Sequence, residues 1–136
     1  MSRLRITQAG PGLSLQDLGR IGWRRFGIST AGAMDRLNLA MANRLVGNPP
    51  DMAALETTLL GCGLVVEEGP VLVAVSGPGL AMKIDGSTIP SGQSALVQPG
   101  QTITLPALRD GVYGYFAVAG GFDVVPVMGS LSTHRR

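Results

Sequence analysis

Turn-forming residues recur about every ten residues from Leu55 onward, and this spacing limits the fold more than any other feature of the chain. Barrels and sandwiches are built with this spacing. With 20 glycines and 9 prolines, the composition also favours many short strands over a helical bundle. The sequence predicts a mostly β fold, with strands at residues 56–60, 64–67, 71–76, 80–84, 95–98, 102–105 and 112–119.

The N-terminal third follows a different pattern. Residues 4–9 alternate apolar and polar side chains, as a half-buried strand does. Residues 10–32 are rich in glycine and almost without periodicity, and a connection of that length in a compact domain is usually functional.

Residues 33–46 predict the one main helix, which Gly47-Asn48-Pro49 ends. Met34, Leu37, Met41 and Leu45 form an apolar stripe that is expected to pack in the core, with Asp35 in the first turn.

Composition excludes several classes of protein. Charged residues make up 15% of the chain and hydrophobic residues 45%, the opposite of a disordered sequence. No apolar run approaches the roughly 18 residues of a membrane span. The single cysteine, Cys62, excludes an internal disulfide and a cysteine-built metal site, and it is expected to be a small buried residue. No basic and apolar leader opens the chain, so a reducing, cytoplasmic setting is expected.

The charges are distributed unevenly. Residues 1–46 carry a net charge of +5 and the remainder −3. Aromatic residues are only 4% and do not interleave with basic ones, which argues against nucleic acid. A local anionic ligand or an acidic partner surface fits the charge pattern, and so do solvated arginines on a loop. The low charge overall suggests that a partner covers part of the surface.

Polar residues on the glycine-rich segment are the first candidates for a site. Gln16, Asp17 and Arg20 place an amide, a carboxylate and a guanidinium where the backbone can approach a ligand. Arg20 could hold a carboxylate or phosphate through two hydrogen bonds, with Asp17 orienting it or acting as a base. Alternatively, Asp17 and Arg20 pair only to pin the loop. Ser29 and Asp35 lie at the start of the predicted helix. They could mark an anion site, or they could simply cap the helix.

Other residues have simpler interpretations. His134 has no Ser or Cys partner at a known spacing and is expected to be an exposed tail residue. Gly77-Pro78-Gly79 lacks the residues of a phosphate loop and is expected to be a plain turn.

Two long stretches resemble a known family. The segment GPGLSLQDLGRIGWRRFGISTAGAMDRLNLAMANRLVGNPPDMAALETTLLG (10–61) resembles the opening signature of the biotin-dependent carboxyltransferase-like family. This family is also called allophanate hydrolase subunit 2 and includes the C subunit of 5-oxoprolinase. The segment YFAVAGGFDVVPVMGSLST (115–133) is similar to its second signature. The resemblance covers nearly the whole chain, and it implies that residues 1–136 are a single domain, the N-terminal portion of a longer carboxyltransferase-like domain.

The resemblance implies a cyclophilin-like β-barrel with one main helix and a sister subunit that is of the allophanate hydrolase subunit 1 type or is the B subunit of 5-oxoprolinase. With a third subunit, the two would form an ATP-dependent hydrolase that opens 5-oxo-L-proline to L-glutamate. ATP is expected at the level of the complex, with no metal. The alternatives are a carboxyltransferase component of a urea carboxylase or a non-catalytic regulator of the sister subunit. Self-association is a further expectation.

The resemblance also marks polar signature positions. The substrate-binding candidates are Gln16, Asp17, Arg20, Ser29, Asp35, Ser130, Ser132 and Thr133, while Asn43, Asn48 and Glu56 are further signature positions. Two positions depart from the family's usual pattern, since Tyr113 and Leu131 stand where it usually has arginine. The loss of two guanidinium groups weighs against catalysis and in favour of the regulator.

Overall fold

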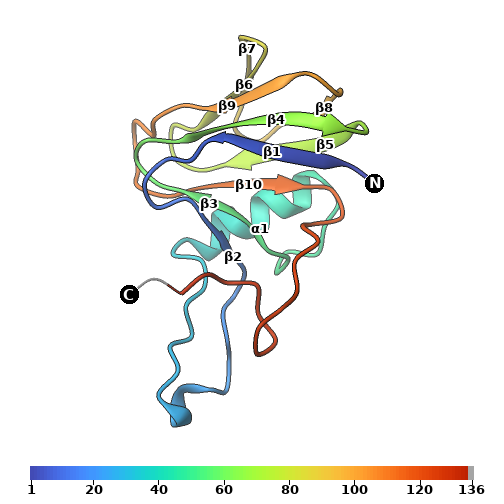
Figure 1. Ribbon diagram of the computed structural model, residues 1–136. Coiled ribbons are helices and arrows are strands. Elements are labelled where there is room, and N and C mark those ends of the chain that lie inside the picture. Colours follow the sequence, from blue (N-terminus) through green and yellow to red (C-terminus); the bar gives the residue numbers. More distant parts are fainter. Residues whose placement is uncertain (135–136) are drawn as a thin grey trace.

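Short strands that are apolar on at least one face assemble in the computed structural model into two antiparallel sheets. The structure describes residues 1–134, and these form two five-stranded sheets, ordered β1-β4-β9-β6-β7 and β2-β3-β10-β5-β8 (Figure 1). The elements are β1 (Arg3–Gln8), β2 (Ser14–Gln16), η1 (Arg24–Phe26), α1 (Arg36–Leu45), β3 (Ala54–Thr57), β4 (Cys62–Glu68), β5 (Val71–Ser76), β6 (Ala81–Ile84), β7 (Ser87–Pro90), β8 (Ser94–Val97), β9 (Thr102–Leu105) and β10 (Gly114–Val118).

The prediction of a mostly β fold with one main helix is confirmed. Every predicted strand has a counterpart whose bounds differ by a few residues at most. Two strands were not predicted. β2 is only three residues long and lies inside the glycine-rich segment, while β7 is largely exposed and ends in a proline, so neither shows a clear alternating pattern.

The main core lies between the two sheets. Val66 and Ile103 of the first sheet and Val73 and Phe116 of the second are fully buried in one hydrophobic cluster. Each such side chain contributes roughly 1.5–3 kcal/mol through removal of its apolar surface from water. Cys62 belongs to this cluster, and its burial raises the pKa of the thiol to about 11, so the prediction of a small buried residue is confirmed.

The helix α1 packs against the second sheet in a separate cluster. Its residues Leu39 and Ala42 contact a surface that includes Ala74, Tyr115 and Ala117. Three small residues of the sheet (Ala54, Ala74 and Ala117) allow the helix to approach closely. The amide of Asn43 is also buried, and it donates to the carbonyl oxygen of Met52 over 2.6 Å.

The predicted core stripe of the helix is wrong for three of its four residues. Met34, Leu37 and Met41 are 67%, 73% and 45% exposed, whereas Leu45 is half-buried and packs against the buried cluster as predicted. The helix turns its alanine-bearing side to the sheet because the small side chains allow close packing and Asn43 finds hydrogen-bond partners there. The helix also begins later than predicted, at Arg36, so that Asp35 is its N-cap rather than a first-turn residue.

A narrow arm, defined here as residues 20–30, projects from the body of the molecule (Figure 1). Its base is closed by a 2.6 Å hydrogen bond from the Arg20 N–H to the Thr30 carbonyl oxygen. At its tip η1 brings the rings of Trp23 and Phe26 to 5.7 Å, and the Arg25 guanidinium lies 4.8 Å from the Phe26 ring centre. The glycine-rich segment is therefore partly ordered by its own contacts.

Within residues 1–134, no helix combines the length and the apolar character that a membrane span requires.

Candidate functional site

Asp17 is the centre of a hydrogen-bond network that joins distant parts of the chain. Its carboxylate accepts hydrogen bonds of 2.6 Å from the hydroxyls of Ser130 and Ser132 and of 2.8 Å from the backbone N–H groups of Leu131 and Gly19. Burial raises the pKa of this carboxyl, but the four hydrogen bonds outweigh burial and leave the pKa below its ordinary value. The carboxylate thus anchors the C-terminal segment 127–134 against the segment that follows β2.

Arg20 does not pair with Asp17. The ion pairs among residues 1–134 join Arg3 to Glu68 and Arg5 to Glu67. The Nε of Arg20 donates instead to the Val127 carbonyl oxygen over 3.1 Å, and its Nη1 is buried with no hydrogen-bond partner in the described chain. The hypothesis that Asp17 and Arg20 pin the loop by pairing is therefore wrong, because each group binds the C-terminal segment separately.

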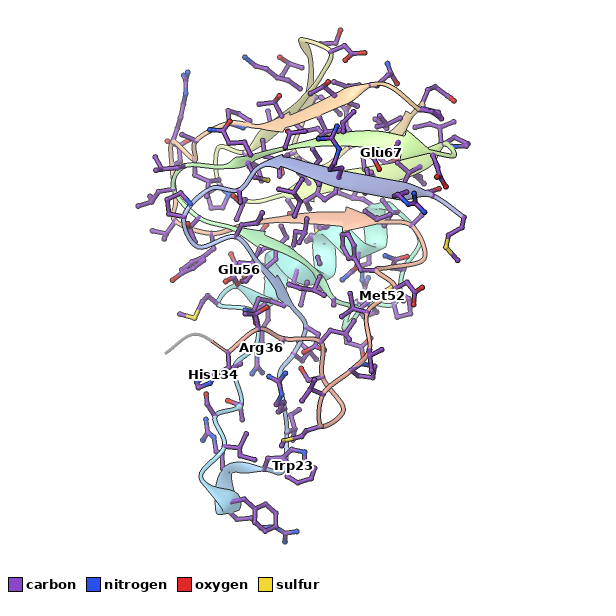
Figure 2. All side chains as sticks on the ribbon, viewed as in Figure 1. Trp23, Arg36, Met52, Glu56, Glu67 and His134 are labelled. Carbon is purple, nitrogen blue, oxygen red and sulfur yellow. The ribbon has the colours of Figure 1, made fainter. Side chains whose placement is uncertain are left out.

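A pocket of about 250 Å³ opens where the base of the arm, β3 and the C-terminal segment meet. Its walls include three of the predicted site residues, Gln16, Ser29 and Thr133. The complete lining is Gln16, Ser29, Ala31, Gly32, Met34, Glu56, Tyr113, Thr133 and His134. Figure 2 shows Glu56 and His134 on the same side of the molecule. His134 is exposed, as predicted, yet it contributes to the pocket.

Glu56 is the acidic residue in the pocket wall, and its hydrogen-bond partners come from distant parts of the sequence. The Tyr115 hydroxyl donates to Glu56 Oε2 over 2.6 Å, and the Met34 N–H donates to the same oxygen over 3.0 Å. The Asp35 N–H in turn donates to the Tyr115 hydroxyl oxygen over 2.8 Å. Burial first, and then the hydrogen bond to Glu56, raises the pKa of Tyr115 far above its ordinary value, so its hydroxyl stays a donor.

The second carboxylate oxygen of Glu56 is the one left for a ligand. Glu56 is 4% exposed, and its Oε1 makes no hydrogen bond within residues 1–134, although the residue lines the pocket. A carboxylate oxygen that lines a pocket and has no protein partner is a strong acceptor for an N–H or O–H group of a bound molecule. From the sequence, Glu56 was predicted only as a signature position. A glutamate inside an apolar strand was the signal that could have identified it.

Gln16 organises the pocket rather than offering a free group. Its Nε2 donates over 3.0 Å both to the Ser14 hydroxyl and to the Thr133 carbonyl oxygen, while its Oε1 accepts from the Gly32 N–H over 3.2 Å. Through the last two of these contacts, the amide joins the C-terminal segment to Gly32, just past the base of the arm.

The start of the helix is also satisfied internally. Asp35 caps α1 by accepting from the Asn38 N–H over 3.0 Å, and the N–H groups of Gly32 and Asp35 are bound to Gln16 and Tyr115. The Ser29 hydroxyl oxygen accepts from the Ala31 N–H over 3.2 Å. The sequence left two interpretations open for Asp35, an anion site or a helix cap. The structure shows the helix cap.

The predicted residues thus fall into three groups. Gln16, Ser29 and Thr133 line the pocket; Asp17, Ser130 and Ser132 form the adjoining network; Arg20 and Asp35 lie outside the pocket lining.

Of the two positions where the family usually has arginine, Tyr113 is in the pocket wall, while Leu131 contributes its backbone N–H to Asp17. Gly77-Pro78-Gly79 forms a turn, as predicted, with the Leu80 N–H bound to the Gly77 carbonyl oxygen. Among residues 1–134 there is no group of three or more His, Cys, Asp or Glu side chains placed to hold a metal ion.

Comparison with known proteins places this geometry in a family context. The chain is 43% identical over 130 residues to the C subunit of 5-oxoprolinase from Escherichia coli, a match that covers 96% of this chain and 42% of that protein. It is 36% identical over 131 residues to the urea amidolyase of Saccharomyces cerevisiae, covering 96% of this chain and 7% of that one. The chain thus spans less than half the length of each of these relatives.

A solved structure gives the same result for the fold. The K. lactis urea amidolyase superposes with a TM-score of 0.91 at 32% identity, over 96% of this chain and 8% of that one. Residues 26–136 match the family described as carboxyltransferase domain, subdomain A and B. Since this match covers most of the sequence, the chain belongs to the carboxyltransferase domain, subdomain A and B, family.

Proposed function

We propose that this chain supplies part of the C subunit of an ATP-dependent 5-oxoprolinase, which opens the lactam of 5-oxo-L-proline to L-glutamate together with a sister subunit. The observation that carries this proposal is the 43% identity to the E. coli 5-oxoprolinase protein over 96% of the chain. ATP acts at the level of the assembled complex.

The pocket beside Glu56 suits a cyclic amide. The lactam of 5-oxo-L-proline carries an N–H group next to its carbonyl, and Glu56 Oε1 is an acceptor without a partner in the described chain. A hydrogen bond from an N–H to a carboxylate is roughly twice as strong as one between neutral groups. Such a contact orients the lactam ring in the pocket, and His134 can offer a ring N–H to the substrate's carboxylate.

Carboxyl transfer to urea is the second candidate. The 36% identity to the S. cerevisiae urea amidolyase favours it, as does the TM-score of 0.91 to the K. lactis protein. Urea also carries N–H groups beside a carbonyl, so the same contact with Glu56 would serve this substrate. The pocket therefore supports an amide-like substrate under either proposal, and an activity assay distinguishes the two.

The test is reconstitution of the protein with its sister subunits, followed by two parallel assays. One measures ATP-dependent release of L-glutamate from 5-oxo-L-proline. The other, run with a biotin carboxylase and its biotinylated carrier added as the source of carboxybiotin, measures ATP-dependent carboxylation of urea. Release of glutamate without carboxylation of urea is the expected result. Carboxylation of urea alone would assign the second candidate. An assembled complex that is inactive in both assays would overturn both enzymatic proposals and favour a regulatory subunit.

A further inference from the structure

A row of hydrogen bonds between α1 and the second sheet ends at Glu56. The Ser76 hydroxyl on β5 donates to Asn38 Oδ1 over 2.6 Å, and Asn38 Nδ2 donates to Asp35 Oδ2 over 2.6 Å. The row continues through the backbone of Asp35, whose N–H donates to the Tyr115 hydroxyl oxygen. The Tyr115 hydroxyl then donates to Glu56 Oε2. The start of the helix and two strands of the sheet therefore act together on one carboxylate.

The Tyr115 hydroxyl is held in one orientation. Its oxygen accepts from the Asp35 N–H over 2.8 Å, so its own proton is directed to Glu56 Oε2, 2.6 Å away. Successive hydrogen bonds of this kind polarise and strengthen one another. The side chain is fully buried in the cluster between α1 and the second sheet, where close packing restrains the ring. Glu56 thus receives this hydrogen bond from a rigid donor.

Both donors to Glu56 act on the same oxygen. The Met34 N–H also reaches Oε2, over 3.0 Å, while Oε1 has no hydrogen bond within residues 1–134. In the described chain, Arg20 Nη1 is the side-chain atom that is fully buried without a partner, so Glu56 Oε1 is accessible from the pocket that the residue lines. Two donors on one oxygen restrict rotation of the carboxylate. The pocket consequently faces one carboxylate oxygen in a fixed position.

A fixed carboxylate oxygen discriminates between ligands by their hydrogen-bonding groups. A carboxylate accepts hydrogen bonds and donates none. An amide N–H placed against it forms a charge-assisted hydrogen bond, whereas an ester oxygen would bring a second acceptor against the negative charge. A site built to bind an N–H group rejects the analogue that lacks it, because the polar group of the site is then left unpaired. This discrimination depends on the position of Oε1, which the protein sets through Oε2.

We propose that Tyr115 is a positioning residue for Glu56, and that the pocket consequently selects amides with a free N–H over lactones and esters of the same shape. Tyr115 lies outside the pocket lining, so it acts on the ligand through the carboxylate. The inference deepens the proposed function and rests on it for the choice of lactam, whereas the fixed acceptor comes from the contacts of Glu56 Oε2.

Titration calorimetry on the protein assembled with its sister subunits, without ATP, tests the proposal by measuring two dissociation constants. One compound is 5-oxo-L-proline, and the other is its lactone analogue of the same configuration, in which a ring oxygen replaces the ring N–H. The wild-type complex should bind the lactam about 10- to 100-fold more tightly than the lactone, as expected for one hydrogen bond to a charged group. The ratio of the two constants is the readout, because partial unfolding lowers the bound amount of both compounds and leaves this ratio unchanged.

Two variants address the carboxylate and its donor. Tyr115→Phe removes the hydroxyl and keeps the ring. In the described chain Glu56 is then held by the Met34 N–H alone and must be ordered when the lactam binds, so the preference for the lactam should fall by about three- to tenfold. Glu56→Gln should abolish the preference, because the amide NH₂ that faces the pocket is a donor and cannot accept the lactam N–H.

Thr57→Val is the matched control. It removes a buried hydroxyl that is next to Glu56 on β3 but donates to the Thr58 carbonyl oxygen. The ratio of the two dissociation constants should remain that of the wild type. An equal fall in Thr57→Val and Tyr115→Phe would show a general effect of losing a buried hydroxyl and would overturn the proposal.

The remaining outcomes separate this inference from the proposed function. Equal binding of lactam and lactone by the wild type, binding of neither, or the full wild-type preference in Tyr115→Phe or Glu56→Gln would each overturn the inference. Release of glutamate on addition of ATP, without any preference for the lactam, would contradict the inference alone. The expected preferences in a complex that releases no glutamate would contradict the proposed function alone.

Discussion

The side chain of Ser132 is bound to Asp17 twice, although 115 residues separate them in the sequence: its hydroxyl donates to the carboxylate over 2.6 Å and accepts from the Asp17 N–H over 3.0 Å. Together with Ser130, this pair ties the C-terminal segment to the chain that follows β2. Gln16 and Thr133, which line the pocket, are next in sequence to Asp17 and Ser132, so the network helps to fix two of the pocket's walls.

Replacing the Asp17 carboxylate should destabilise the protein. In Asp17→Asn, an amide nitrogen would face hydroxyl and backbone donors that now bind a carboxylate. The expected loss is about 2–4 kcal/mol in the free energy of unfolding, because hydrogen bonds to a charged group are lost and buried donors are left unpaired. Chemical denaturation measures this loss. Asp51→Asn, at an exposed position, is the control and should change stability little.

The same carboxylate should make stability depend on pH in the acid range. Its hydrogen bonds hold the folded-state pKa of Asp17 below the ordinary value of 3.8. The unfolded chain therefore takes up this proton at a higher pH, so the stabilisation is complete well above pH 3.8 and is lost as the pH falls through the folded-state pKa. The difference in melting temperature between wild type and Asp17→Asn should shrink on acidification. A constant difference would show that the ionised form has no special role.

Glu56→Gln should reduce activity more than stability. The amide oxygen of the new side chain must remain toward Tyr115 and Met34, because both are donors to Glu56 Oε2. The amide NH₂ would then face the pocket, where it meets the substrate N–H as a second donor. We expect kcat/KM of the assembled enzyme to fall about 10- to 100-fold, in line with about 1.5–3 kcal/mol for a lost hydrogen bond to a charged group.

Glu68→Gln, at an exposed position on β4, is the matched control and should leave kcat/KM unchanged. Full activity of Glu56→Gln would remove Glu56 from substrate binding. An equal loss in both variants would point to a general effect of charge.

The base of the arm should tolerate no side chain at Gly19. Its φ is +97°, and an added Cβ would lie 2.4 Å from the Thr30 carbonyl oxygen. Gly22 provides a control with a similar φ of +94° but open space around an added Cβ. Gly22→Ala should cost about 1–2 kcal/mol from backbone strain alone. Gly19→Ala should lower the free energy of unfolding clearly more than Gly22→Ala does, as measured by thermal unfolding. Equal losses of stability in the two variants would mean that the close contact at the arm base does not contribute to stability.

Much of the architecture could be predicted from the sequence because it depends on neighbouring residues. Alternating side chains and regularly spaced turns predict most of the strands. Asp35 at one end and Gly47 at the other predict the limits of the one main helix to within a few residues. Gln16, Ser29 and Thr133 were also predicted as site residues, and the structure brings them into one pocket although more than a hundred residues separate the first from the last.

Other features were decided only by the tertiary structure. The apolar stripe of α1 was predicted to be buried, but the alanines of β3, β5 and β10 select the opposite side of the helix, which leaves Leu37 and Met41 exposed. Glu56 lines the pocket with its Oε2 held by Tyr115, which is 59 residues away in sequence, so only the tertiary structure shows which of its oxygens is free of hydrogen bonds within residues 1–134. Local propensity determines whether a segment is a strand or a helix; close packing against residues from distant parts of the chain determines which side chains are buried and which groups remain free to act.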